Sequence, residues 1–334
     1  MAVTQAEIAK VVGVSQTIVS DVIHGRVRGR VRPETRQRIL AAARQMGYRP
    51  NALAQALRLR QSRQIVYLSV HDESREFPIL READLAGVAK ALRIDGYRLL
   101  IEIANDAERE VTVLTEMIGS GICDGGILRA YRGSDQLWEE LSEIREPVVV
   151  IGQCPHPTLT SVAHDVPAFM TQAVEHLKGL GHDRIGLVID PVYDVYHRLL
   201  LETWRKATGE GDPARWQVER TGRNEVMRVV KDWLAEPDGP TAIVSVNDAC
   251  TLGTAAALRS AGRTLGRDFD LHGISGGDYN GIHEPGTWIS ALDMDAVGSR
   301  AARELLAMLD GKPGPGPVRL PAPLVQITYD TLST

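Results

Sequence analysis

The sequence predicts an all-α helix-turn-helix headpiece followed by an α/β region folded as two doubly wound lobes. Basic residues concentrate near the N-terminus, helical patterns with turn signals fill the first 47 residues, and strand and helix patterns alternate beyond residue 64. The chain has 334 residues, of which 43% are apolar and 24% are charged. This is the composition of an ordinary globular protein with two or three domains.

Charge is distributed unevenly along the chain. Residues 1–63 hold twelve Lys or Arg against three Asp or Glu, a net charge of +9, whereas the remainder carries −14. A basic segment on an acidic body suggests a polyanion partner at one end only. Charge alone leaves open a solvated basic face without a partner.

Three short helices are predicted in the basic segment. Thr4 and Glu7 fit a capping box, in which each side chain bonds a free N–H of the first turn. Gly13 suits the positive φ that ends a helix, and Ser15 is a good N-cap for the next one. A third helix begins at Pro33, a residue favoured at the first helical position. These elements describe a helix-turn-helix, with a plain three-helix bundle as the alternative.

Short apolar strands alternate with helices in the rest of the chain. The expected strands are 65–70, 97–103, 125–128, 148–151, 185–189, 241–246 and 271–274. The expected helices are 85–92, 111–118, 169–180, 198–206, 225–234 and 251–261. Such alternation is typical of parallel sheets covered by helices on both faces. The region is long for one sheet, so two lobes are expected, with a ligand at the carboxyl ends of their strands.

A resemblance to a known family runs along nearly the whole chain. The headpiece of LacI/GalR transcriptional regulators is similar to VTQAEIAKVVGVSQTIVSDVIHG and RPETRQRILAAARQMGYRPNALAQALR. The effector-binding core of that family is similar to SVAHDVPAFMTQAVEHLKGLGHDRIGLV, TAIVSVNDACTLGTAAALRSAG and GISGGDYN. The resemblance implies two lobes of periplasmic-binding-protein type joined by three crossovers.

The resemblance also implies a domain organisation. We expect a DNA-binding domain at 1–48, a hinge helix and linker at 49–63, and a bilobal effector-binding and dimerisation domain at 64–334. The first lobe would contain 64–160 and 292–320, and the second lobe 161–291 and 321–334. The crossovers are therefore expected near Thr160, Ala291 and Pro321.

The recognition helix of such a headpiece places its first residues at base edges in the major groove. Gln16 suits adenine, and the methyl group of Thr17 suits a thymine methyl group. Asp21 stands where many family members carry arginine, so it accepts from a cytosine amino group or pairs with Arg26 or Arg28. The expected contacts of the headpiece are Thr4, Ser15, Gln16, Thr17, Ser20, Asp21, His24, Arg26, Arg28 and Arg30.

Two further segments are expected to contact DNA. The loop GRVRGRVR after His24 is longer and richer in arginine than the family's usual loop, and it suits phosphates or a groove, with a solvated loop as the alternative. The hinge helix is too short to be stable alone and should fold with its dimer mate on DNA. The resemblance implies that Leu57 enters the minor groove, with helix–helix packing as the alternative. The expected hinge contacts are Asn51, Ala54, Leu57 and Arg58.

The effector site departs from the family's pattern. The resemblance places Asn247, with Asp248, where a ligand hydroxyl is bound, and Asp278 at an acidic ligand position, with helix capping and a turn as the alternatives. Leu200 replaces the family's arginine, and Arg198 lies two residues earlier on another helix face.

The remaining effector candidates are Arg81, near a position that is usually aromatic, and two tryptophans, Trp204 and Trp288. Stacking on a ligand ring is possible for the tryptophans, but core packing is the favoured alternative. A sugar or sugar-like effector is the default, while nucleoside, phosphorylated and acidic ligands remain open.

Motifs of other function classes are missing from the sequence. It has no GxxxxGK[ST] phosphate loop, HExxH zinc site, GxSxG elbow or apolar run of ~20 residues, and its three cysteines form no CxxC pair. We expect no enzymatic activity, cofactor, metal or membrane contact.

The expected protein is a cytoplasmic homodimer that binds operator double-stranded DNA under the control of a small-molecule effector, most simply as a repressor. The alternative is a small-molecule binding protein or sensor of the same fold, whose effector is not a sugar or which has lost effector control.

Overall fold

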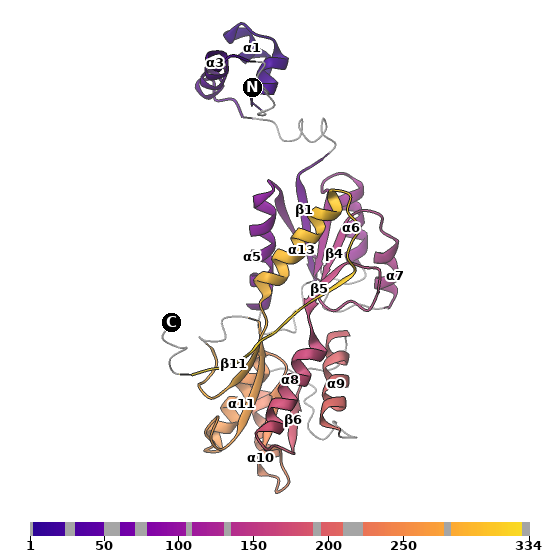
Figure 1. The fold of residues 1–334 in the computed structure, drawn as a ribbon, viewed down its shortest axis with the longest axis vertical. Helices are drawn as coiled ribbons and strands as arrows, with labels where there is room; N and C mark the ends of the chain where they lie inside the picture. The colour runs from indigo at the N-terminus through magenta and orange to yellow at the C-terminus, as the bar shows by residue number, and fades with distance from the viewer. Residues whose placement is uncertain are drawn as a thin grey trace. The chain divides into compact units, whose positions relative to one another are not determined.

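A computed structural model describes most of the chain (Figure 1). The described residues are 3–23, 31–49, 61–70, 79–104, 109–129, 135–189, 195–209, 223–276 and 282–328. They form two compact units, Met1–Ser62 and Arg63–Thr334, which are treated separately below. No helix in these ranges is long and apolar enough to cross a membrane.

The first unit contains three helices: α1 (Gln5–Val12), α2 (Gln16–Ile23) and α3 (Pro33–Gln45). The expected capping box of Thr4 and Glu7 begins α1, and Gly13 ends it in the left-handed region with φ 75°. The hydroxyl of Ser15 accepts a hydrogen bond from the Ile18 amide at 3.3 Å, as an N-cap of α2 should. Local side-chain chemistry thus begins and ends these helices where the sequence predicts.

The three helices enclose a small apolar core. Buried side chains from all three helices form it: Ile8, Ala9, Val12, Val19, Val22, Ile39 and Ala43. A hydrogen bond of 3.0 Å joins the Arg38 guanidinium to the Val12 carbonyl oxygen and so ties α3 to the end of α1. The helix-turn-helix is therefore held by its own packing.

Six parallel strands form one sheet of the second unit, which we call sheet A. Its spatial order is β10-β5-β4-β3-β1-β2. The strands are β1 (Gln64–Val70), β2 (Arg98–Ala104), β3 (Gly125–Arg129), β4 (Val148–Ile151), β5 (Ser161–His164) and β10 (Pro317–Leu320). Strand β3 is buried along its whole length, as a central parallel strand covered on both faces should be.

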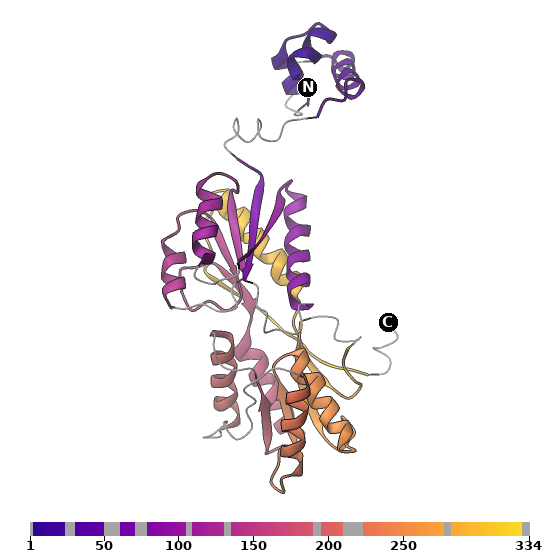
Figure 2. The same cartoon turned by 180° about the vertical axis from the view of Figure 1, so that it is seen from behind.

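Helices cover both faces of sheet A (Figures 1 and 2). One face packs on α5 (Ile79–Ile94) and α13 (Met294–Leu309), and the other on α6 (Glu110–Gly119) and α7 (Asp135–Glu143). Sheet A with these four helices is the first lobe.

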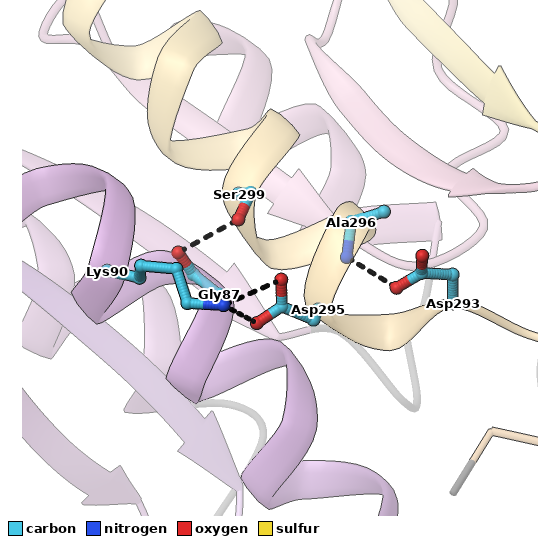
Figure 3. Close-up of polar contacts among 6 residues, drawn as sticks. All are labelled: Gly87, Lys90, Asp293, Asp295, Ala296 and Ser299. Atoms are coloured by element: carbon cyan, nitrogen blue, oxygen red, sulfur yellow. Dashed lines mark hydrogen bonds and ion pairs between the residues drawn. The ribbon is translucent and has the colours of Figure 1, made fainter.

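The two helices α5 and α13 lie in close contact along a seam (Figure 3). Lys90 pairs with Asp295 at 3.0 Å, and the Ser299 hydroxyl donates to the Gly87 carbonyl oxygen at 3.2 Å. A Cβ atom added to Gly87 would overlap the Asp295 carbonyl oxygen, so glycine is required for this approach. The seam joins helices whose sequences lie about 200 residues apart.

The second lobe is built on sheet B, with the order β11-β9-β8-β7-β6. Its strands are β6 (Ile185–Val188), β7 (Ala242–Ser245), β8 (Asp270–Ser275), β9 (Trp288–Ala291) and β11 (Leu324–Gln326), of which only β11 runs antiparallel to its neighbour. Helices α8 (Val166–Gly179) and α9 (Val195–Thr208) cover one face, and α10 (Arg223–Ala235) and α11 (Asp248–Ser260) the other.

The chain crosses between the lobes three times, at β5 to α8, β9 to α13, and β10 to β11. The first crossover follows His164, later than the boundary near Thr160 that the sequence suggests. The reason is that β5 pairs with both β4 and β10 and therefore belongs to sheet A. With this correction, the structure has the expected fold class: a helical headpiece and two doubly wound α/β lobes.

Candidate DNA-binding surface and effector site

The carboxyl ends of both sheets adjoin the crossovers. Strands β5 and β10 leave sheet A at its carboxyl edge, and β9 leaves sheet B at its carboxyl edge. The two carboxyl edges therefore face each other across the crossover segments, which lie between the lobes in Figures 1 and 2. Ligands of doubly wound sheets bind at such edges.

Polar side chains replace apolar ones at the carboxyl edge of sheet A. On the face that packs against α5 and α13, Tyr67 and Ile127 belong to the apolar core. Two residues further along their strands, on the same face, stand Ser69 and Arg129. His164 follows Val162 in the same way on β5. All three polar side chains are buried, so the core ends in a polar layer.

An ion pair lies within this polar layer. The Arg129 guanidinium lies 2.9 Å from the carboxylate of Asp84 on α5, and the two side chains are 7% and 0% exposed. The Leu85 amide and the Tyr67 hydroxyl donate to the other carboxylate oxygen at 2.9 and 3.3 Å. Burial raises the pKa of Asp84, and the Arg129 charge opposes this shift.

His164 is neutral at the end of β5. Burial lowers its pKa to about 4, with a smaller opposing effect from Asp293 and a lowering effect from Arg129. Within the described part of the chain, its Nε2 atom and the Ser69 Oγ atom are buried without a hydrogen-bond partner. Gln153, which follows β4, donates to the His164 carbonyl oxygen at 2.8 Å.

The carboxyl edge of sheet B carries Asn247 and Asp248 after β7. Asn247 is the N-cap of α11 and accepts from the Cys250 amide at 2.8 Å, which is the capping alternative. Asp248 lies 2.9 Å from His283 Nε2, and these side chains are 6% and 1% exposed. Ser275, at the end of β8, has a buried Oγ atom that bonds no described residue.

The effector candidates on α9 differ in exposure. Arg198 is exposed in the first turn, close in sequence to the carboxyl end of β6. Leu200, at the family's arginine position, is fully buried. Trp204 is 1% exposed and packs in the core of the second lobe with Phe169 and Leu200, so its position favours core packing over ligand stacking.

The structure corrects the placement of Trp288. This residue begins β9 and pairs in register with His272, whereas Ala291 pairs with Ser275 at the carboxyl edge. Its ring contacts the His176 ring in a tilted arrangement, with a centroid distance of 4.2 Å and an interplanar angle of 60°. At ~3.3 Å per residue, Trp288 lies about 10 Å from the edge that faces the first lobe, and therefore outside the expected effector site.

Two effector candidates have no described side chain. Asp278 lies outside the described residues, and the structure describes the backbone but not the side chain of Arg81 on α5. Three residues that sequence reasoning missed are Asp84, Arg129 and His283. Arg129 is a charged residue at the end of an apolar strand pattern and Asp84 lies among the apolar residues of a helix, so these two had a signal in the sequence, whereas His283 lies in a polar stretch that gave none.

Helix α2 presents polar side chains at its start. Ser15, Gln16 and Thr17 are exposed, and Asp21 is half-buried. Ser20 is buried, with 9% of its surface exposed. Contrary to the expectation, it therefore does not belong to the exposed face of the helix. This arrangement leaves the first turn of the second helix free to enter a groove.

Thr4 has a local partner at the start of α1. Its hydroxyl accepts from the Glu7 amide and lies 3.0 Å from the Glu7 carboxylate. The other expected DNA contacts lie outside the described residues: His24, Arg26, Arg28, Arg30, Asn51, Ala54, Leu57 and Arg58.

A helix-turn-helix unit followed by two doubly wound lobes is the architecture of a transcriptional regulator with a ligand-binding core. The comparisons with known proteins agree. The family described as "Bacterial regulatory proteins, lacI family" matches residues 4–51, and "Periplasmic binding protein-like domain" matches residues 174–327. The chain therefore carries a LacI-family DNA-binding domain and a periplasmic-binding-protein-like domain, and it is a DNA-binding transcriptional regulator.

The chain is similar to known transcriptional regulators over most of its length. The chain is 28% identical over 93% of its length to the HTH-type transcriptional regulator PtxS of Pseudomonas putida, of which 91% is covered. It is 25% identical over 97% of its length to the lactose operon repressor of Escherichia coli, of which 89% is covered. The crystal structure of the lac repressor dimer bound to operator and the anti-inducer ONPF superposes with a TM-score of 0.84 at 23% identity, covering 98% of both chains.

Proposed function

We propose that this chain is a cytoplasmic homodimeric repressor whose operator affinity is controlled by a small molecule bound between the two lobes. The observation that carries the proposal is α2, which follows the Gly13 turn and exposes Gln16 and Thr17 at its start. Two copies are needed because a pseudo-palindromic operator matches the two-fold symmetry of a dimer.

Base reading would come from the first turn of α2. Gln16 suits the adenine edge, and the methyl group of Thr17 suits a thymine methyl group. Asp21 would accept from a cytosine amino group or pair with a nearby arginine. Arg26, Arg28 and the hinge residues Asn51, Ala54, Leu57 and Arg58 would supply phosphate and minor-groove contacts.

Effector control would act through the crossovers. A ligand between the carboxyl edges would contact Asn247, Asp248 and Asp278 on the second lobe, together with Arg198 on α9. Its binding would change the angle between the lobes and so the separation of the hinge helices in a dimer. A sugar-like ligand remains the default, since the lac repressor, a relative of this chain, is named for lactose.

Operator selection from random duplex DNA tests this function. The full-length protein is incubated with the library, and bound sequences are recovered with and without a panel of cell metabolites. We expect a symmetric pair of half-sites, with binding that weakens steeply as salt rises and changes with one metabolite. Recovery of no preferred sequence would overturn the proposal. If the protein prefers one sequence but no metabolite changes its binding, the proposed DNA binding stands and the proposed effector control is refuted.

A further inference from the structure

We propose that the Asp84–Arg129 ion pair makes the effector site select uncharged, hydroxyl-bearing ligands over ligands that carry a carboxylate or phosphate. The inference rests on the proposed binding of an effector between the lobes and names the residues of the first lobe that set the ligand's charge. Arg129 would contact the ligand, and Asp84 is a positioning residue that acts through it.

Arg129 lies at the edge where such a ligand would bind. It is the last residue of β3, which occupies the interior of sheet A between β1 and β4. The carboxyl ends of these strands adjoin the crossovers to the second lobe. Ser69 pairs in register with Arg129 on the neighbouring strand β1, and His164 lies two strands away on β5, in the same polar layer and on the same face of the sheet.

Asp84 compensates the positive charge that Arg129 brings to this edge. Their side chains approach to 2.9 Å and are almost fully buried. The Leu85 amide and the Tyr67 hydroxyl hold the same carboxylate from its other oxygen. An anionic group that approached Arg129 would also approach Asp84, and like charges repel strongly where little water screens them.

The other titratable groups of the described chain place no positive charge beside the pair on its own face of sheet A. Arg319 on β10 is a cation near this edge, but its side chain lies on the opposite face and donates to Ser161 Oγ at 3.4 Å. Asp165 and Asp293 are acidic caps of α8 and α13 at the crossovers. His164 is kept neutral by burial, and His283 is paired with Asp248. Arg198, which would contact the ligand from the second lobe, has an exposed side chain, so solvent screens its attraction for an anion more than it screens the buried pair.

The carboxyl edges of the two sheets suit hydroxyl groups. Ser69 Oγ, His164 Nε2 and Ser275 Oγ are buried polar atoms that bond no other described residue. Buried polar groups are costly unless they find a partner. A ligand hydroxyl both donates and accepts, so it suits serine hydroxyls and a neutral imidazole as well as the ion pair. A carboxylate only accepts, which leaves fewer of these groups satisfied.

The test uses the full-length protein and matched pairs of ligands. The pairs are D-glucose and D-glucose 6-phosphate, D-galactose and D-galactonate, cellobiose and cellobionate, and adenosine and its 5′-phosphate. Apparent Kd values come from the dependence of the thermal midpoint on ligand concentration. We expect at least one uncharged member to bind, and to bind at least tenfold more tightly than its charged counterpart.

Variants separate selectivity from stability. In Asp84→Asn the charged member should bind at least as tightly as the uncharged member, because the anion no longer meets a carboxylate. The control is Asp295→Asn, which removes the exposed pair with Lys90 on the same two helices and should leave the preference unchanged. If Asp84→Asn does not fold, Arg129→Gln serves instead, and it should increase the preference for the uncharged member.

Three results would overturn the inference. They are a charged member that binds the wild type as tightly as its partner, a preference that folded Asp84→Asn leaves unchanged, and a panel in which no uncharged member binds. Operator selection does not depend on this panel, so loss of the proposed regulatory function would be seen separately.

Discussion

The carboxylate of Asp84 on α5 and the guanidinium of Arg129 at the end of β3 form a buried ion pair of 2.9 Å. Burial places a free-energy cost on both charges, and their attraction with the bonds from Leu85 and Tyr67 offsets it. The pair thus lies at the boundary between the apolar core of the first lobe and its carboxyl edge.

Removing one partner of this pair should destabilise the protein strongly. Arg129→Leu leaves the Asp84 carboxylate buried and unpaired, and should lower the free energy of unfolding by roughly 3–5 kcal/mol. The double variant with Asp84→Leu should lose less, because it leaves no buried charge. Urea unfolding of the three proteins measures this, and a double variant less stable than Arg129→Leu would contradict the account.

Acid should destabilise the fold through His164. The pKa of this histidine is 6.5 in the unfolded chain and about 4 in the folded protein, so the unfolded state binds more protons between these values. Stability is therefore complete above about pH 6.5 and is lost as the pH falls towards 4, by about 3 kcal/mol in total.

Urea unfolding between pH 4.5 and 7.5 measures this effect. His164→Gln should reduce the slope of stability against pH, without removing it. Part of the slope should remain in this variant, because burial also lowers the pKa of His272 to about 3, and this histidine makes stability depend on pH in the same direction. A variant with the wild-type slope would show that His164 does not contribute.

The seam between α5 and α13 should tolerate no side chain at Gly87 (Figure 3). The Cβ atom of Gly87→Ala would overlap the Asp295 carbonyl oxygen and push the helices apart, at a cost of roughly 1–3 kcal/mol. Gly119→Ala on α6 is the matched control, since its Cβ atom would meet open space. Alanine there should be neutral or stabilise by about 0.5–1 kcal/mol. Thermal unfolding measures the stability of both variants. An equal loss of stability in the two would refute the close approach of the helices at Gly87.

Truncation of α2 side chains should weaken specific DNA binding without unfolding the headpiece. Gln16→Ala should cost about 1–3 kcal/mol of operator binding, because this side chain is exposed and available to a base edge. Gln37→Ala, an exposed glutamine on α3, is the control and should bind as the wild type does. Gel-shift titration of the selected operator compares them.

The hinge prediction concerns Leu57, which lies outside the described residues. Leu57→Ala should lose specific operator binding and keep weak nonspecific binding, because a minor-groove wedge bends the duplex while phosphate contacts remain. Equal operator affinity of the two proteins in a gel-shift titration would refute the wedge.

Local structure followed the sequence closely. The Thr4 capping box, the left-handed Gly13 and the Ser15 cap are contacts between residues at most three or four apart, so the residue types alone predict them. The alternation of strands and helices predicted two doubly wound lobes for the same reason, since periodicity is a local property. The expected ranges did not include helices α7 and α13 or strands β5, β9, β10 and β11. All of these except α7 lie at crossovers where the chain changes lobes.

The sequence by itself determined the headpiece, most of the alternation of strands and helices, and the resemblance to a regulator family, because each depends on short-range patterns and motifs. Only the tertiary structure decided that Trp288 lies at the amino end of β9, away from the carboxyl edge of sheet B, and that Trp204 belongs to the core. It also decided that Asp84 meets Arg129 and that Asp248 meets His283. These outcomes depend on strand register and helix packing between distant segments, and the pattern within one segment carries no information on which distant side chain it will meet.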